Sequence, residues 1–319
     1  WGKLALEGKE KGDMKKVLVV GSLNMDMVLS VDHHPVPGET IIGDGITYHP
    51  GGKGANQAYA VGKLGGDVRI IGCVGWDNNG MILTENLAQA GVDTTAINRM
   101  PEAPTGMAII DVDKKGDNSI IVISGANACL TPDLLRKQKA SVEWSDFIMT
   151  QLETPIDTVL ELARMAKKAD KCMILDPSPA RADLPDELFP LIDIMKPNEK
   201  ELSILTGMPT ETDEEIKAAA DALLEKGVSK VVVTLGARGA MLADGNEKLF
   251  FEAKPVVPVD TTAAGAAFTA AMVNGLAQEM GMIQAIRMAN GVASIVVTRH
   301  GAQASIPDRD EIDDLIWNY

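Results

Sequence analysis

The chain has 319 residues, of which 45% are hydrophobic, and this suits one large α/β unit and excludes general disorder. The formal net charge of −15 argues against a nucleic-acid partner, because phosphate backbones are bound by clustered Lys and Arg. No apolar run approaches the ~18 residues of a membrane helix, and three scattered cysteines without metal or disulfide spacing predict a cytoplasmic protein.

Residues 1–13 lack the apolar segment and the cleavage pattern of a secretory signal. We interpret them as an N-terminal extension or an expression remnant, with a natural start at Met14 and a folded domain over residues 14–319. The apolar run at 16–20 predicts a buried strand. It ends at Gly21-Ser22 without the G-x-G-x-x-G spacing of a dinucleotide-binding turn, which disfavours a nicotinamide-linked dehydrogenase.

Asn24 and Asp26 lie two residues apart, so on extended backbone their side chains share one face. An amide and a carboxylate on one face can bind sugar hydroxyls, which both donate and accept hydrogen bonds. The alternative is a pair of turn residues that bond their own backbone. The short segments at 27–31 and 40–48, and those at 105–112 and 119–124, predict two hairpins that form a small sheet beside the main body, serving as a lid over about 26–48 and 105–124.

The string G-G-K-G-A-N-Q at 51–57 leads into a helix predicted over residues 58–64. Its glycines allow close backbone approach, and Lys53 and Asn56 provide polar groups. It is not a P-loop, because no Ser or Thr follows the lysine. A functional site is favoured over a plain glycine-rich helix entry.

From residue 68 onward, apolar runs alternate with helical patterns. This predicts an open, mostly parallel sheet with crossover helices on both faces. Strands are predicted at 68–74, 147–150, 173–176, 192–196 and 231–235, and helices at 80–90, 156–169, 199–206 and 212–226.

Ligands of such sheets bind at the carboxyl ends of the strands. Glu153 follows one strand, and Asn198 and Glu201 follow another. Each has a structural alternative: Glu153 as a solvated loop acid, and Asn198 with Glu201 as a helix cap with its N3 carboxylate. Residues 234–239 can equally form an ordinary hairpin turn.

Residues 260–268 read D-T-T-A-A-G-A-A-F, between a strand-like run at 255–259 and a helical pattern from Phe268. A helix start offers free N–H groups and the positive end of the macrodipole, and small residues let an anion approach. We predict an anion cradle for a phosphate in transit. The alternative is a tight turn that packs small residues against the sheet.

Taken in order, these motifs resemble those of the ribokinase-like family of carbohydrate kinases, from about Lys16 to the C-terminus. The resemblance also covers G-A-N-A at 125–128, Q-L-E at 151–153, P-N-E at 197–199, T-L-G at 234–236 and T-R-H-G-A-Q at 298–303. It implies ATP-dependent phosphorylation of a sugar hydroxyl, with ATP, Mg²⁺ and K⁺ as cofactors. For the family members that this chain resembles most, that hydroxyl is the 5-hydroxyl of D-ribose.

The resemblance also assigns residues to roles. The sugar site would comprise Asn24, Asp26, Gly52, Lys53, Gly54, Asn56 and Glu153. The nucleotide would be bordered by Asn198, Thr234, Gly236, Gly239 and Asn290. Glu201, with Asn198, would act through water on Mg²⁺. The monovalent cation site would comprise Asp260, Thr262, Val296, Arg299, Gly301 and Ser305, largely through backbone carbonyls.

The catalytic stretch comprises Ala263, Ala264, Gly265 and Ala266. The family motif ends in Gly-Asp, and that Asp is the expected general base, whereas this chain has Gly265-Ala266. The resemblance therefore implies a chain that binds sugar and nucleotide but turns over very slowly. The change is either an engineered inactivation, which the otherwise intact motifs favour, or the mark of a natural pseudo-kinase.

Two questions of function stay open at this point. A non-catalytic sugar or nucleotide binder would share every binding residue with a kinase. Another pentose or a nucleoside could fit a site with Asn24 and Asp26, because specificity rests on hydrogen-bond geometry. Lid hairpins expose edge strands that need covering, and together with the resemblance this predicts a homodimer that pairs the lids.

Overall fold

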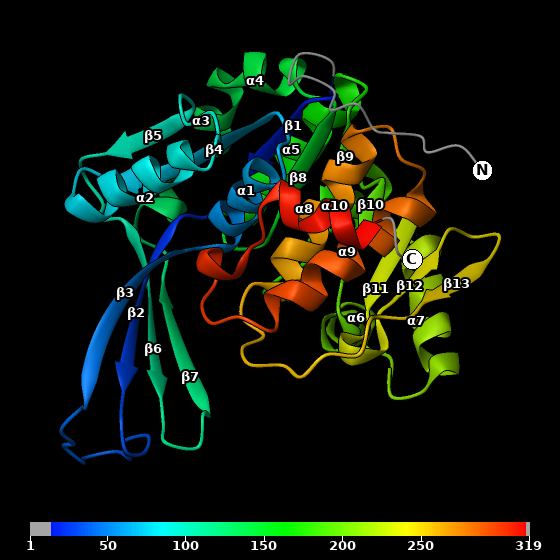
Figure 1. The fold of residues 1–319 in the computed structure, drawn as a ribbon. Helices are drawn as coiled ribbons and strands as arrows, with labels where there is room; N and C mark the ends of the chain where they lie inside the picture. Colours follow the sequence, from blue (N-terminus) through cyan, green and yellow to red (C-terminus); the bar gives the residue numbers. More distant parts are fainter. Residues whose placement is uncertain (1–13, 317–319) are drawn as a thin grey trace.

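The computed structural model describes residues 14–316, so the interpretation of residues 1–13 lies outside the described residues. Its centre is a nine-stranded sheet (Figure 1). In spatial order the strands are β13 (Lys248–Phe251), β12 (Ala240–Ala243), β11 (Lys230–Thr234), β10 (Ile194–Met195), β9 (Cys172–Leu175), β8 (Phe147–Thr150), β1 (Val17–Val20), β4 (Val68–Gly75) and β5 (Ile97–Met100). Only the pairings of β11 with β12 and of β12 with β13 are antiparallel. The predicted open, mostly parallel sheet is confirmed.

Helices cover both faces of this sheet. Alternate residues of β1 point to opposite sides, Val17 and Val19 into one hydrophobic core and Leu18 and Val20 into the other. The first core is closed by α1 (Lys53–Lys63), α2 (Asn78–Gln89), α8 (Ala264–Ala277), α9 (Met282–Val296) and α10 (Arg309–Ile316). The second is closed by α3 (Pro132–Lys137), α4 (Lys139–Trp144), α5 (Ile156–Lys168), α6 (Glu199–Thr206) and α7 (Asp213–Glu225). Within residues 14–316, no helix is long and apolar enough to cross a membrane.

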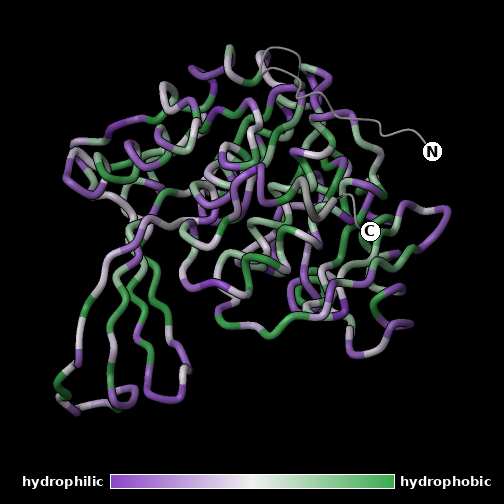
Figure 2. The backbone as a smooth tube through the Cα atoms, viewed as in Figure 1, coloured by the Kyte–Doolittle hydropathy of each residue, from purple (hydrophilic) through white to green (hydrophobic). Residues whose placement is uncertain are grey.

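The second sheet is small and extends away from the main body (Figure 1). Its order is β3 (Gly45–Gly51), β2 (Asn24–Ser30), β6 (Gly106–Val112) and β7 (Asn118–Ile123). Two antiparallel hairpins, β2–β3 and β6–β7, are joined by a parallel pairing of β2 with β6. Hydrophobic residues run along these strands although the sheet projects into solvent (Figure 2).

Four sequence predictions need correction. Residues 255–259 form no strand, because Pro255 and Pro258 remove backbone donors and the run is exposed. The following helix begins at Ala264 instead of Phe268, so the small residues form its first turn. Helix α1 begins at Lys53, five residues before the predicted start, and β3 begins at Gly45 instead of residue 40.

Candidate active site

Glu153 joins three loops at the carboxyl edge of the main sheet. Its carboxylate accepts a hydrogen bond from the Ser22 hydroxyl and another, 3.1 Å long, from the backbone N–H of Lys53. The Lys53 ammonium lies 3.9 Å from the other carboxylate oxygen, and the Glu153 side chain is only 12% exposed. Glu153 therefore holds the turn after β1, the start of α1 and the loop after β8 together. Ser22 was absent from the sequence-based assignments, although it lies in the motif that precedes Asn24.

Asp26 lies on β2, and its carboxylate lies against Gly51 of β3. Gly51 is two residues along β3 from the residue that pairs with Asp26. Burial raises the pKa of Asp26 to about 7, and the nearby Glu153 charge adds to this effect, while Lys53 opposes it. A carboxylate that is costly to ionise here is poised to accept hydrogen bonds from hydroxyl groups near neutral pH. Asp26 is therefore available to a polyhydroxylated ligand.

Asn24 and Asn56 are both buried and partly engaged. The Asn24 side-chain oxygen accepts a 2.8 Å hydrogen bond from the amide of Asn127. Asn127 also accepts a hydrogen bond from the backbone N–H of Leu23 and donates one to its carbonyl. The Asn56 oxygen accepts 2.9 Å from the Gln303 amide. Both side chains are thus held in fixed orientations, and within residues 14–316 their own N–H₂ donors have no hydrogen-bond acceptor.

Two glycines allow the start of α1 to meet the β1–β2 turn. Gly52 has φ +90°, and a Cβ there would lie 2.6 Å from the backbone nitrogen of Asn24. A Cβ on Gly54 would lie 2.6 Å from the backbone of Gly21. The sugar-site assignments on β2, in the 51–57 string and at Glu153 are therefore brought together in space.

We predict that Gly51→Ala abolishes binding of a polyhydroxylated ligand at Asp26. A Cβ at this position would lie 2.1 Å from Oδ2 of Asp26, so the carboxylate must move out of place. Gly45→Ala on the same strand is the matched control, because a Cβ there meets nothing within 4 Å. Calorimetric titration with D-ribose, the sugar that the sequence resemblance implies, should show loss of binding for the first variant only. Equal affinities for the two variants would contradict this role of Asp26.

The first turn of α8 presents unbonded donors. Ala263 precedes the helix in the left-handed region, with φ +61°, and no side chain caps the helix start. The Ala264 N–H bonds the Thr261 carbonyl at 3.3 Å, whereas the N–H groups of Gly265 and Ala266 have no acceptor among the described residues. Free donors at a helix N-terminus attract anions. A non-glycine residue in this region is strained, so the contacts around Ala263 must hold the backbone in this orientation.

A buried polar cluster lies beneath this turn, and the sequence did not reveal it. Asp176 follows β9 and Lys196 follows β10, and their charged groups are 3.2 Å apart. The other Asp176 oxygen accepts a 2.9 Å hydrogen bond from the Gln57 amide. The Thr269 hydroxyl of α8 lies 3.2 Å from that same oxygen. These contacts connect α1, two strand ends and α8.

The residues assigned to the nucleotide side also have structural roles. Asn198 caps α6 by accepting from the N–H of Glu201, and Glu201 Oε2 accepts from the N–H of Asn198, both at 2.8 Å. The structural alternative for this pair is thus present, while Glu201 Oε1 has no hydrogen bond among the described residues. Thr234 ends β11 beside them, with its N–H on the Pro197 carbonyl.

Gly236 and Gly239 form the tight turn between β11 and β12, as the hairpin alternative predicted. Gly239 has φ +97°, and a Cβ there would lie 1.9 Å from the carbonyl oxygen of Phe251. The Asn290 amide donates to the same carbonyl at 3.1 Å. Asn290 therefore fixes the chain after β13 against the turn.

Asp260 joins the loops before α8 and after α9. Its carboxylate accepts 2.8 Å bonds from the N–H groups of Thr262 and Gly301. These hydrogen bonds hold the pKa of Asp260 below its ordinary value despite partial burial. Of the other cation-site assignments, Ser305 is buried and donates to the Ala302 carbonyl, while the Arg299 guanidinium pairs with Glu311 on α10.

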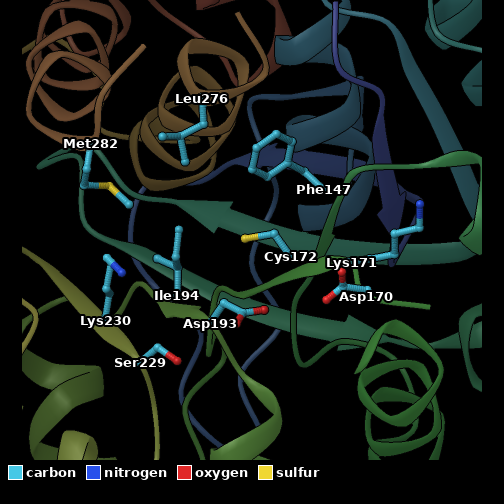
Figure 3. A pocket seen from close by; sticks show the side chains of 10 residues that line it. All are labelled: Phe147, Asp170, Lys171, Cys172, Asp193, Ile194, Ser229, Lys230, Leu276 and Met282. Carbon is cyan, nitrogen blue, oxygen red and sulfur yellow. The ribbon is translucent and has the colours of Figure 1, made fainter. Parts of the chain in front are cut away.

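A hollow of about 500 Å³ lies at the opposite, amino-terminal edge of the sheet (Figure 3). It is lined by the first residues of β8, β9 and β11 and by the end of α8, and none of the assigned site residues takes part. The chemistry-bearing groups described above instead follow β1, β8, β9, β10 and β11. Because these strands are parallel neighbours, their carboxyl ends form one edge, which is where ligands bind in such sheets.

Comparisons with known proteins cover nearly the whole chain. The model of the pfkB family carbohydrate kinases matches residues 14–309. Ribokinase of Haemophilus influenzae is 42% identical over 93% of this chain and 97% of its own length. Deoxyribokinase of Salmonella typhi is 33% identical over 94% of this chain and 98% of its own. The solved structure of Arabidopsis thaliana ribokinase complexed with ribose and ATP is similar with a TM-score of 0.90, at 35% identity, covering 95% of this chain and 99% of that one.

Proposed function

This chain belongs to the pfkB family of carbohydrate kinases, and from this we propose that it is built to phosphorylate the 5-hydroxyl of D-ribose with ATP. The observation that carries the proposal is the meeting of two features at one sheet edge. Hydroxyl-binding groups surround Asp26 and Glu153, and unbonded N–H groups stand at the first turn of α8. The ribose and ATP complex of a similar ribokinase supports the same pair of ligands.

In the proposed reaction the sugar oxygen forms a bond to the γ-phosphorus while the bond from that phosphorus to the β-bridging oxygen breaks. Asp26 and Asn56 hold the sugar through its ring hydroxyls, with Lys53 and Glu153 around them. The N–H groups of Gly265 and Ala266 receive the developing phosphoryl charge, and such positioning and charge stabilisation dominate phosphoryl transfer. The hydroxyl proton needs an acceptor, and Ala266 provides none.

Calorimetry on the unchanged chain tests the substrate. D-ribose is expected to bind more tightly than 2-deoxy-D-ribose, because a buried site built for hydroxyl groups is left with unpaired polar atoms when one is missing. A deoxyribokinase is among the relatives, so the comparison is informative. Preference for the deoxy sugar, for another pentose or for a nucleoside would replace ribose in the proposal. If ribose and ATP both bind but Ala266→Asp gains no turnover, the chain is a non-catalytic binder.

We propose that Asn198, Thr234, Gly236, Gly239 and Asn290 border the nucleotide. Glu201, whose Oε1 has no hydrogen bond within residues 14–316, would hold a water of the Mg²⁺ ion that neutralises nucleotide phosphates. A cytoplasmic setting is supported by the three cysteines, which are free thiols.

We propose a K⁺ site beside the first turn of α8, around Asp260, Thr262, Val296, Arg299, Gly301 and Ser305. Asp260 already fixes the two loops whose carbonyls would bind the ion. Replacing Na⁺ by K⁺ at constant ionic strength is expected to tighten ATP binding several-fold in calorimetry. Asp260→Asn should lose that difference, and an unchanged chain that binds ATP equally in both salts would remove the site.

We propose that the small sheet is a lid and that two copies of the chain pair through it. Four consecutive residues of its edge strand β7, from Ile120 to Ile123, are 45–60% exposed, so both faces of the strand are apolar. Ile120→Glu and Ile121→Glu place a charge on opposite faces. Sedimentation should show a dimer for the unchanged chain and a monomer for the variant on the paired face. A monomer at micromolar concentration without any substitution would contradict the proposal.

A further inference from the structure

Lys196 is a charged side chain buried directly beneath the anion cradle. It follows β10, and its side chain is only 4% exposed. Its ammonium nitrogen lies 3.4 Å from the position that a Cβ on Gly265 would take, so the charge rests against the first turn of α8. The ammonium is therefore in van der Waals range of the helix start.

The ammonium is only partly compensated. It has three N–H donors, and within residues 14–316 its one charged partner is Asp176, at 3.2 Å. Asp176 is held from its other oxygen by the Gln57 amide and lies beside the Thr269 hydroxyl, so it is a fixed anchor. Buried ion pairs are costly to desolvate and are often replaceable by apolar residues without loss of stability. A role beyond stability is therefore reasonable for this pair.

The surroundings of the ammonium favour an anion. The unbonded N–H groups of Gly265 and Ala266 and the positive end of the α8 dipole lie on the same turn. In a chain of net charge −15, a phosphate must be attracted by local positive groups, and here a buried cation and a helix N-terminus coincide. Burial of the Lys196 side chain strengthens the attraction of its ammonium for a phosphate.

We propose that the Lys196 ammonium binds the γ-phosphoryl group of ATP at the first turn of α8, with Asp176 as the positioning residue that holds the ammonium in place. The inference rests on the proposed kinase function and adds a charged contact to the backbone donors. It assigns the cluster a ligand, the γ-phosphoryl group, which ATP carries and ADP lacks.

The test compares ATP with ADP by calorimetry in the unchanged chain, where slow turnover preserves the ATP. Lys196→Gln alone strands a buried carboxylate and risks misfolding. The double variant Asp176→Asn/Lys196→Gln removes both charges and keeps polar side chains for Gln57 and Thr269. The matched control is Asp221→Asn/Lys248→Gln, which neutralises a 2.7 Å pair between α7 and β13.

The double variant is expected to weaken ATP binding by about 10- to 100-fold, the value of one charge-assisted hydrogen bond, and to change ADP binding by less than about threefold. The control should leave both affinities unchanged. Asp176→Asn alone should lower the ATP preference by a smaller factor, because the ammonium remains but loses its anchor.

Three results would overturn the inference. Parallel weakening of ATP and ADP would make the pair structural, and unchanged affinities would make it irrelevant to the nucleotide. An unchanged chain that binds ATP no better than ADP would remove the contact as well. Failure of the unchanged chain to bind either nucleotide would instead remove the proposed function itself, and with it this inference.

Discussion

Ala266→Asp is expected to raise the rate of ribose-dependent ADP formation by about 10²- to 10⁴-fold, the usual contribution of a general base. The residue is half-buried in the first turn of α8, next to the N–H groups that we assign to the phosphoryl charge. A carboxylate at that point can take the hydroxyl proton as the sugar oxygen attacks. The helix dipole also favours a negative charge there.

The control for this gain is Ala266→Asn, which has nearly the same size and no base. Coupled assays of ADP release with D-ribose, Mg-ATP and K⁺ should show activity for the Asp variant only, and none when the sugar is omitted. Equal rates for the Asn and Asp variants would show that side-chain size, not proton transfer, limits turnover. Activity of the unchanged chain at the Asp level would contradict the assignment of the base to this position.

Asp26→Asn is expected to weaken D-ribose binding by about 10- to 100-fold, because an ionised acceptor of hydroxyl hydrogen bonds becomes neutral. In the unchanged chain the pKa of Asp26 is raised to about 7, mainly by burial. Ribose affinity should therefore rise about tenfold per pH unit up to pH 7 and level off above it. In the Asn variant this pH dependence should vanish while ATP affinity stays the same.

The same variant should be more stable than the unchanged chain at pH 8. The folded pKa of Asp26 lies above its ordinary value of 3.8, so ionisation between pH 4 and pH 7 costs stability that is intact below pH 3.8. The upper bound of this cost is about 4 kcal/mol. Thermal unfolding across pH 4–8 should show the gap in Tm opening as the pH rises, and a constant gap would contradict the raised pKa. Substrate binding and stability would then oppose each other at one residue.

Local patterns predicted the main body well. Strand β8 and helix α6 have the bounds that their sequences indicated, because each is a short apolar or periodic run with clear flanking signals. The strand predicted at 255–259 was wrong, because its apolar residues favour a strand while its two prolines prevent one. Strands β12 and β13 and helix α9 were not predicted, although they complete the sheet edge and the first core.

The site was harder to foresee than the fold. The family resemblance grouped Asp26, Glu153 and the 51–57 string in one site, and the structure brings them together. Asp176 and Lys196 were missed because the periodicity of a strand gives the face of a residue but not its neighbour across the sheet. Their pairing depends on β9 lying beside β10, and nothing local to either strand encodes that order. The contact of Gln303 with Asn56 was also not predicted, because it depends on packing of the segment after α9 against α1.

That last contact has a consequence for how the protein is made. Gln303 meets Asn56 across 247 residues, and Ser22 meets Glu153 across 131. Contacts of such sequence separation form late in folding, because the entropy of closing a long loop is lost before the contact contributes favourable energy. A chain still emerging from the ribosome can hold β1, β2 and α1 and still lack the amide that orients Asn56. Competence to bind sugar therefore arrives only with the C-terminal segment, after most of the secondary structure is in place.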